Sequence, residues 1–483
     1  MVNDKLTGLV MDEPLLWEKG SSGRTGISIP RTEVPEVETD NEFTWEGPDF
    51  PELSEVDVVR HFTRLSTWNF GVDTGMYPLG SCTMKYNPKL NEKTASMEGF
   101  AYCHPLLPDL LSQGVLNLVY DLEKYLCEIT GMDYFTLQPA AGAHGELCGM
   151  LIFSQYHRKN DDKRTKIIIP DTAHGTNPAS CALCGFKPVG LSSGSDGILH
   201  LEKVRQLMDE DTAGIMITNP NTLGLFEKNI REISEIVHDK GGLVYCDGAN
   251  MNAVMGAVKM KELGVDVIHV NLHKTMSTPH GGGGPGAGPV GVVEKLLPFL
   301  PVPRVIKEGK IFRLKEYFPD SIGKLHAFYG NFGVLIKAYT YILSMGKKLS
   351  DASKMAVLNA NYIREKLKDT YHLPFDMPCM HECVFTDSNF HEHKISTLDI
   401  AKRLLDYGFH PPTIYFPLVV SGAIMIEPTE TESKEELDKF IEVMKKIAQE
   451  ASEHPDILHN APSNTKVSRL DETLAARKPR LSG

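Results

Sequence analysis

A regular alternation of apolar strand-like runs and amphipathic helical segments, between residues 115 and 272, constrains the fold of this chain more than any other feature. The strand-like runs are 166–170, 185–191, 213–220, 241–248 and 267–272, and helical periodicity occupies 115–130, 145–158, 201–210 and 228–240. Strands that alternate with helices form a mostly parallel sheet, because each crossover helix buries its apolar stripe against one face of that sheet. This order predicts an α/β fold.

A second, smaller unit is predicted downstream. A connecting helix near 331–349 is followed by strand 381–387, helix 396–408, strand 421–428 and a closing helix that starts after Ser433. We therefore divide the chain into an extended N-terminal arm (1–60) rich in Pro, Glu and Asp, a large α/β domain (61–330), a small C-terminal α+β domain (331–455) and a polar tail (456–483).

Composition and charge argue against several classes of function. The 483 residues carry a formal net charge of −13, which disfavours a nucleic-acid-binding face. No apolar run approaches the roughly 18 residues of a membrane span. The N-terminus lacks the basic and apolar regions of a signal peptide. These features predict a cytoplasmic protein that binds neither nucleic acid nor membranes.

The nine cysteines show no metal-binding spacing. Cys181 and Cys184 form one C-x-x-C, but no second pair and no suitably spaced histidines accompany it. We therefore predict no metal site and interpret both residues as small core side chains, with a redox role left open.

Lys274 is the first candidate for chemistry. It follows the apolar run 267–272, and a glycine-rich segment begins at Gly281. In open α/β sheets, ligands bind outside the carboxyl ends of the strands, and glycines let the backbone approach a ligand closely. A lysine that is crowded there becomes an amine nucleophile. The alternative is an ordinary solvated surface lysine.

The stretch "QPAAGAHGE" (138–146) places Ala141, Gly142 and Ala143 at the start of a predicted helix. Free backbone N–H groups and the helix dipole favour a phosphate at such a position. The alternative is a plain junction between a loop and a helix. The stretch matches neither the P-loop nor the dinucleotide-binding pattern.

Asp247 lies at the end of one predicted strand, and His174 follows another. Asp247 ends the apolar run 241–248, where a carboxylate needs a cation or several donors, although a helix N-cap is a common alternative. His174 follows the run 166–170, and its flat ring is suited either to stacking on an aromatic cofactor or to a purely structural role. With Lys274 and the helix start, these residues form the set that binds pyridoxal phosphate: an anion site, a ring face, a partner for the ring nitrogen and an amine.

Several longer motifs add a family resemblance. "NFGVDTGMYPLGSCTMKYNP", "QPAAGAHGE", "DTAHGTNPAS", "DGANMNA", "NLHKT", "PHGGGGPG" and "MIEPTE" together resemble the glycine decarboxylase P protein of the glycine cleavage system. The resemblance covers most of the chain. It implies a fold-type I, aspartate-aminotransferase-like pyridoxal phosphate enzyme, and it matches the cofactor-bearing C-terminal half of a P protein that is split into two chains.

The resemblance also implies roles for individual residues. Lys274 would hold pyridoxal 5'-phosphate covalently, Asp247 would pair with the ring nitrogen, and His174 and Ala249 would cover the two ring faces. Phosphate contacts are implied for Ala141, Gly142 and Ala143, with His273 as a further contact, and Thr222 would reach the ring hydroxyl.

The implied reaction is the decarboxylation of glycine, with transfer of the aminomethyl group to the lipoyl disulfide of H protein, which is the activity of an aminomethyl-transferring glycine dehydrogenase. The implied partners are subunit 1 of the P protein, in an assembly with two copies of each subunit, and lipoylated H protein. Segment 69–88 is a further candidate for substrate or channel contacts. Another fold-type I enzyme acting on a small amino acid, such as a hydroxymethyltransferase or a simple decarboxylase, and a non-catalytic structural subunit remain as alternatives.

Overall fold

The computed structural model describes residues 13–30, 33–35, 49–160, 162–278, 280 and 284–479, and residues 1–74 and 75–483 form two compact units. The first unit contains the 3-10 helix η1 (Leu16–Glu18) and helix α1 (Glu55–Ser66). Helix α1 begins inside the segment predicted as an extended arm, so that prediction was wrong for its last residues. Ser54 and Asp57 form a capping box, which specifies the helix start.

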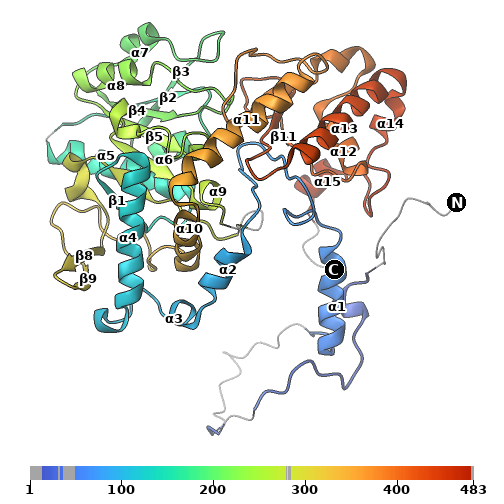
Figure 1. The fold of residues 1–483 in the computed structure, drawn as a ribbon, viewed down its shortest axis with the longest axis horizontal. Helices are drawn as coiled ribbons and strands as arrows, with labels where there is room; N and C mark the ends of the chain where they lie inside the picture. Colours follow the sequence, from blue (N-terminus) through green and yellow to red (C-terminus); the bar gives the residue numbers. More distant parts are fainter. Residues whose placement is uncertain are drawn as a thin grey trace. The chain divides into compact units, whose positions relative to one another are not determined.

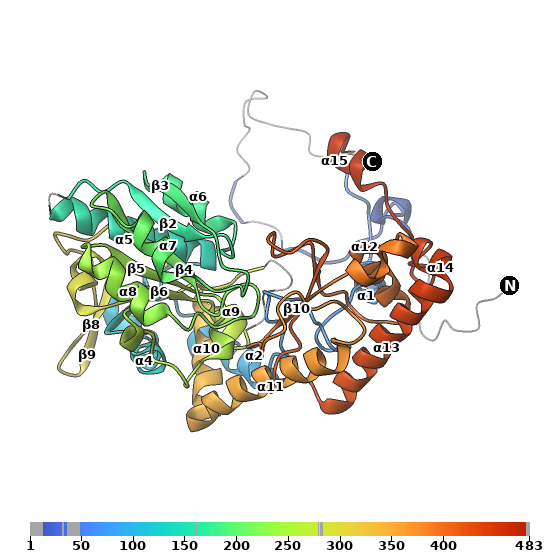
Figure 2. The same ribbon diagram turned by 90° about the horizontal axis from the view of Figure 1, so that it is seen from above.

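A seven-stranded sheet organises the second unit, in the order β1-β7-β6-β5-β4-β2-β3. Its strands are β1 (Tyr134–Thr136), β2 (Lys166–Pro170), β3 (Lys187–Leu191), β4 (Thr212–Thr218), β5 (Leu243–Gly248), β6 (Val267–Val270) and β7 (Val290–Val292). Strands β2 to β6 pair in parallel, and β7 is antiparallel to both of its neighbours. The predicted mostly parallel sheet is confirmed, and helices lie on both of its faces (Figures 1 and 2).

Side-chain alternation along the strands produces a core on each face of this sheet. In β5, Val244 and Cys246 join one buried cluster, whereas Leu243 and Tyr245 join the other. This follows from the two-residue period of a strand, and it explains why the central strands are mostly apolar on both faces. The first cluster packs against helices α4 (Gln113–Thr130), α8 (Ile230–Asp239) and α10 (Phe332–Met345), and the second against α5 (Gly142–Lys159) and α6 (Thr176–Leu183).

A second sheet, of three antiparallel strands in the order β10-β12-β11, lies in the C-terminal part. Its strands are β10 (Cys383–Thr386), β11 (Thr413–Ile414) and β12 (Ala423–Ile426), and they share a core with helices α11 (Leu349–Leu367), α12 (Thr397–Asp406), α13 (Lys434–Glu453) and α14 (Pro455–His459). Ser433 caps α13 by accepting a hydrogen bond from the Glu436 N–H. The four-part domain division stays a prediction.

The remaining elements are short. They are α2 (Lys89–Ala95), α3 (Glu98–Ala101), α7 (Leu201–Leu207), α9 (Leu272–Thr275), α15 (Glu472–Arg477), the hairpin strands β8 (Arg304–Glu308) and β9 (Ile311–Lys315), and the 3-10 helices η3 (Asp109–Leu111), η4 (Met251–Ala253), η5 (Met260–Leu263), η6 (Glu294–Phe299), η7 (Gly346–Lys348) and η8 (Ser388–His393). Among the described residues, no helix has the length and apolar character that are needed to cross a membrane.

Candidate active site

The carboxyl ends of the parallel strands converge on a cavity of about 180 Å³. Eight of the nine residues proposed from the sequence line it, all except Ala141, and the complete lining is Ser81, Gly142, Ala143, Glu146, His174, Thr176, Thr218, Thr222, Asp247, Ala249, Asn250, His269, Asn271, His273 and Lys274. The sheet brings these residues together because β2, β4, β5 and β6 all end at this edge.

Lys274 lies in the one-turn helix α9, directly after β6. The predicted strand 267–272 was too long, because the chain turns after Val270 and Asn271 O accepts the N–H groups of Lys274 and Thr275. This turn brings the half-buried Lys274 side chain into the cavity lining. Its Nζ donates a 2.7 Å hydrogen bond to Ser81 O, which fixes the position of the amine.

Asp247, which is only 2% exposed, has three neighbouring nitrogens. The Asn177 side-chain amide donates to Oδ2 at 3.1 Å, the Ala249 N–H donates to Oδ1 at 3.0 Å, and His269 Nε2 lies 3.3 Å from Oδ1. Burial lowers the pKa of His269, so this ring is neutral at neutral pH. The three nitrogens therefore do not neutralise the buried carboxylate, and Asp247 can hold a cationic group in the cavity.

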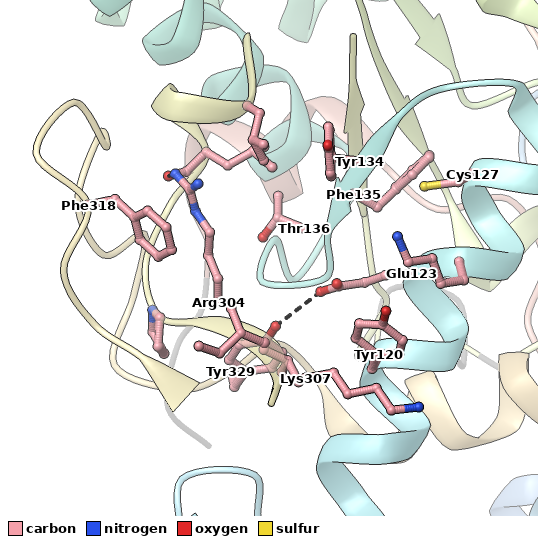
Figure 3. Close-up of a pocket in the computed structure, with 16 residues that line it drawn as sticks. Tyr120, Glu123, Cys127, Tyr134, Phe135, Thr136, Arg304, Lys307, Phe318 and Tyr329 are labelled. Carbon is pink, nitrogen blue, oxygen red and sulfur yellow. Dashed lines mark hydrogen bonds between the residues drawn. The ribbon is translucent and has the colours of Figure 1, made fainter. Parts of the chain in front are cut away.

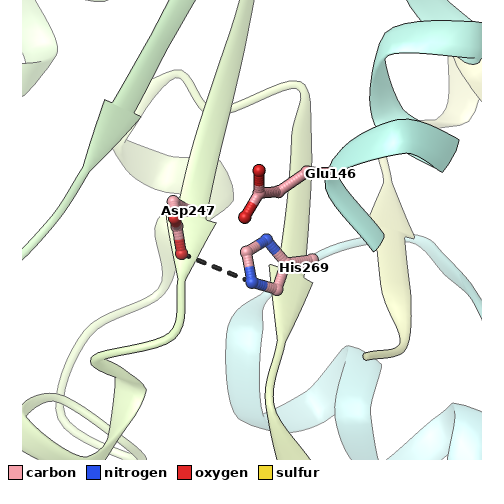
Figure 4. Close-up of side chains that lie close together, drawn as sticks. All are labelled: Glu146, Asp247 and His269. Atoms are coloured by element: carbon pink, nitrogen blue, oxygen red, sulfur yellow. Dashed lines mark ion pairs between the residues drawn. The ribbon is translucent and has the colours of Figure 1, made fainter. Parts of the chain in front are cut away.

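Glu146 is a second carboxyl group beside Asp247, on the second turn of α5. In Figure 4, its side chain extends from the helix toward His269, with Asp247 on the other side of that ring. The Thr176 hydroxyl donates to Glu146 at 2.7 Å. Burial, together with the negative charge of Asp247, raises the pKa of Glu146 to about 7. The sequence interpretation did not select Glu146 or His269, although "AGAHGE" and the run 267–272 contain them.

The start of α5 fits an anion. Ala141 occupies the N-cap with extended backbone, and no side chain in the described part of the chain caps this helix. Asn271 lies close by: a Cβ on Gly142 would stand 2.7 Å from Asn271 Oδ1, an atom without a hydrogen-bond partner among the described residues. The uncapped N–H groups and the helix dipole favour a phosphate at this end.

The described part of the glycine-rich segment approaches this helix start, and residues 281–283 lie outside the described residues. A Cβ on Gly288 would stand 2.1 Å from Ala141 O, and one on Gly286 would stand 2.6 Å from His273 Nδ1. Real Cβ atoms do not approach other atoms so closely, and the Gly288 contact is with backbone that cannot rotate away. Glycine at Gly288 therefore fixes the position of the helix start.

Replacing Gly288 by alanine is expected to destabilise the fold by about 2 kcal/mol and to weaken phosphate binding at the start of α5, because the added methyl group overpacks this contact. Urea unfolding and titration with pyridoxal phosphate measure the two effects. The matched control is Gly190→Ala on the edge strand β3, where an added Cβ meets no atom within 4 Å. Equal stability of the two variants would contradict the prediction.

His273, His174 and Thr222 line the cavity with defined partners. The Ala287 N–H donates to His273 Nδ1 at 3.2 Å, and burial together with the Lys274 charge lowers the pKa of His273 to about 4, so the ring is neutral. His174 Nδ1 lies 2.9 Å from Thr176 Oγ1, which orients its partly exposed ring. The Thr222 hydroxyl donates to Thr172 O at 2.7 Å.

Segment 69–88 contributes Ser81 to the cavity lining. Lys85 is fully buried, and its ammonium donates to Asn252 Oδ1 at 2.9 Å and forms an ion pair with Glu430. Tyr77 stacks on His410 with ring centroids 3.8 Å apart. Both residues have packing roles outside the cavity lining.

The cysteines, all nine of which lie in the described part of the chain, are free thiols. Cys181 is buried, with its Sγ 3.6 Å from Met150 Sδ, whereas Cys184 is half-buried. The interpretation of Cys181 as a small core side chain is confirmed. A redox role for the pair stays untested.

A second cavity, of about 290 Å³, lies between α4, β1 and the β8–β9 hairpin and shares no lining residue with the first. In Figure 3, Glu123 and Tyr329 point toward one another across it, and the Tyr329 hydroxyl donates to Glu123 at 3.4 Å. The Arg304 guanidinium lies 4.0 Å from the centroid of the Phe318 ring and donates to backbone carbonyls. Burial raises the pKa of Glu123 to about 8.

This raised pKa predicts a pH-dependent stability. The unfolded chain releases the Glu123 proton near pH 4.5 and the folded chain near pH 8, so the free energy of unfolding falls as pH rises between these values. Glu123→Gln removes this loss, and we expect it to stabilise the chain by about 3 kcal/mol more at pH 8 than at pH 5. Urea unfolding at both pH values, with the exposed Glu128→Gln on the same helix as control, measures the difference. A pH-independent effect of Glu123→Gln would contradict it.

Comparison with known proteins identifies first the class and then the family. The family model for class-V aminotransferases matches residues 149–284, and the one described as "Glycine dehydrogenase, C-terminal domain" matches residues 352–467. A crystal structure of glycine decarboxylase (P-protein) of the glycine cleavage system, in inhibitor-bound form, superposes with a TM-score of 0.72 at 18% identity, covering 84% of this chain and 93% of that chain. A NifS-like protein gives a TM-score of 0.61 at 17% identity, covering 78% and 99%. The fold is therefore that of the fold-type I, aspartate-aminotransferase-like enzymes.

The sequence relatives are more specific. A protein of Alkaliphilus oremlandii named "Probable glycine dehydrogenase (decarboxylating) subunit 2" is 56% identical over 469 residues, which is 96% of each chain. Proteins with the same name from Listeria monocytogenes and Thermotoga petrophila are 55% and 54% identical, and each alignment covers 96% of this chain and at least 97% of the relative. This chain belongs to the glycine dehydrogenase (decarboxylating) subunit 2 family.

Proposed function

We propose that this chain is the pyridoxal-phosphate-bearing subunit of a split glycine decarboxylase P protein, which decarboxylates glycine and transfers the aminomethyl group to the lipoyl disulfide of H protein. One observation supports this most directly. A single cavity is lined by Lys274, Asp247 and His174, and the uncapped start of α5 adjoins it. An amine, a buried carboxylate and an anion site are the groups that this cofactor needs.

The residues present fit the cofactor. The N–H groups at Ala141, Gly142 and Ala143 would hold the phosphate, with His273 beside them, because this helix start lacks a cap. Asp247 would pair with the ring nitrogen, since its present neighbours leave its charge uncompensated.

The remaining proposed contacts surround the ring. His174 and Ala249 would cover its two faces, and Thr222 would reach its hydroxyl group. Lys274 would hold the cofactor covalently through Nζ. When bound, pyridoxal phosphate supplies an electron sink for the electron pair that remains after glycine loses carbon dioxide.

The chain's own residues control charge and position in this site. Asp247 would stabilise a proton on the ring nitrogen, an electrostatic contribution of the kind that is worth several kcal/mol. His269 stays neutral beside Asp247, and the hydrogen bond between its Nδ1 and the Tyr245 hydroxyl, at 2.7 Å, fixes the ring. Ser81 O orients the Lys274 amine.

The proposal extends to partners and location. The chain would assemble with subunit 1, with two copies of each chain. Lipoylated H protein would accept the aminomethyl group, and the reaction would take place in the cytoplasm. The family name of the relatives, which denotes a second subunit, supports a separate first subunit.

Exchange of carbon dioxide between glycine and labelled bicarbonate tests the function. We expect exchange when this chain is combined with subunit 1 and lipoylated H protein, and much less when either is omitted. Exchange that does not respond to lipoylated protein would favour another fold-type I enzyme. Inactivity of every combination, although the chain binds the cofactor, would favour a non-catalytic subunit and overturn the proposal.

A further inference from the structure

Three ionisable side chains form a fully buried cluster near Lys274. His381 and Glu382 precede β10, Glu427 follows β12, and the pairing of Cys383 with Ile426 places the two glutamates at the same end of this small sheet. Each of the three residues is 0% exposed. His381 Nε2 lies 3.7 Å from Glu382 Oε1 and 4.0 Å from Glu427 Oε1.

A single residue, Ser81, connects this cluster to the candidate active site through its two adjacent peptide groups. The Ser81 N–H donates to Glu382 Oε2 at 2.8 Å, while the carbonyl of the same residue accepts the Lys274 ammonium at 2.7 Å. Ser81 and Thr83 have φ values of 64° and 49°, which are uncommon for residues with a Cβ. A positive φ at such residues persists only where surrounding contacts hold the backbone in place. Here the hydrogen bonds that Ser81 and Thr83 donate to the two glutamates hold it.

The two glutamates accept different numbers of hydrogen bonds. Glu427 accepts from both the N–H and the hydroxyl of Thr83, at 2.9 and 2.6 Å. Among the described residues, Glu382 accepts a hydrogen bond from Ser81 alone, and its Oε1 and both ring nitrogens of His381 have no hydrogen-bond partner. A buried carboxylate with an unpartnered oxygen beside a second carboxylate is costly to ionise.

A metal ion suits this cluster less well than a proton does. Ligand atoms around a tetrahedral zinc lie about 2.0–2.2 Å from the ion, hence roughly 3.5 Å from one another, which is closer than the separations of 3.7 and 4.0 Å. The positive charge of Lys274, which acts on all three side chains, would also repel a cation.

We propose that Glu382 holds a proton on Oε1 while Glu427 carries the negative charge, and that this pair positions the Lys274 amine through Ser81 and sets the charge around it. Glu382 is thus a positioning residue. The part of the inference that concerns Lys274 rests on the function proposed above, whereas the proton on Glu382 does not.

The ionisable groups that surround the pair are consistent with this assignment. Besides each other, Glu382 faces Lys274 and Cys379, and Glu427 faces Lys274 and Glu430. Burial raises the pKa of Glu382 well above its usual range, with Glu427 adding to the effect, and burial raises the pKa of Glu427 to about 7. Burial lowers the pKa of His381 to about 3, so this ring carries no charge, and burial raises the pKa of the nearby Cys82 thiol.

Infrared difference spectroscopy of the full chain without cofactor tests the proton, since it needs no activity. At pH 8, Glu382→Gln should remove one carbonyl band of a protonated carboxylic acid, whereas Glu427→Gln should remove carboxylate absorption and retain that band. The exposed Glu262→Gln is the control. If Glu382→Gln removes carboxylate absorption, the proton assignment is overturned.

Titration of the bound cofactor's absorbance tests the coupling to Lys274. Glu427→Gln removes an anion near the amine and should lower the pH midpoint by about one unit, because the anion favours the protonated form. Glu382→Gln, a neutral isostere of the protonated acid, should leave the midpoint in place. If the two variants shift it equally, or neither does, the coupling is overturned. Failure of glycine exchange alone would count against the proposed function and not against the proton on Glu382.

Discussion

Lys274→Ala is expected to lower glycine–bicarbonate exchange by roughly 10³-fold or more, the scale on which enzymes lose activity when a group that reacts directly is removed. The amine is the only lysine in the cavity lining formed by the described residues, and Ser81 holds it in place. Borohydride treatment followed by peptide mass analysis should find the cofactor on Lys274 in the parent chain and no label in the variant.

Two further variants make this result specific. Lys187→Ala changes an exposed lysine on the edge strand β3, so it should keep both the label and the exchange. Lys274→Arg keeps the positive charge but provides no usable amine, so it should be as inactive as the alanine variant. Substantial exchange by either Lys274 variant would show that the amine is dispensable and would contradict the assignment.

Much of the large sheet could be predicted because its central strands are buried on both faces. The runs 166–170, 213–220 and 241–248 correspond to β2, β4 and β5, with end errors of at most two residues. The order of the strands could not be predicted, since it depends on packing between elements far apart in the chain. The strands β1 and β7, of three residues each, were missed because such short segments show no period.

Likewise, only some residues of the candidate site could be predicted from the sequence. Lys274 and Asp247 could be selected because each follows an apolar run, and strand ends in α/β sheets gather at one edge. Ser81 could not be selected, since it is 193 positions from the lysine that it contacts. His269 was hidden inside a predicted strand, where its position facing Asp247 depends on the pairing of β5 with β6.

Replacing Asp247 by asparagine is expected to lower glycine–bicarbonate exchange by about 10²–10³-fold, equivalent to about 3–4 kcal/mol of lost electrostatic stabilisation. Asparagine preserves the size of the side chain and one acceptor oxygen but cannot keep a proton on the cofactor's ring nitrogen. The covalent label on Lys274 should therefore remain, while the rate with saturating glycine falls. Absorbance spectra and saturation kinetics separate these two effects.

The matched control is Asp171→Asn, which changes an exposed aspartate that also follows a parallel strand but lies outside the cavity lining. Asp171 accepts hydrogen bonds from Ser193, and its replacement should leave exchange unchanged within about twofold, since exposed polar contacts contribute little.

Glu146 provides a second test of the role of Asp247. It is a second carboxyl group beside Asp247, and when it is ionised it replaces part of the negative charge that Asp247→Asn removes. If Asp247→Asn recovers activity as the pH rises through the range in which Glu146 ionises, and the double variant with Glu146→Gln does not, the two carboxyl groups act on the same ring nitrogen. Full activity of Asp247→Asn at every pH would instead remove Asp247 from the cofactor site.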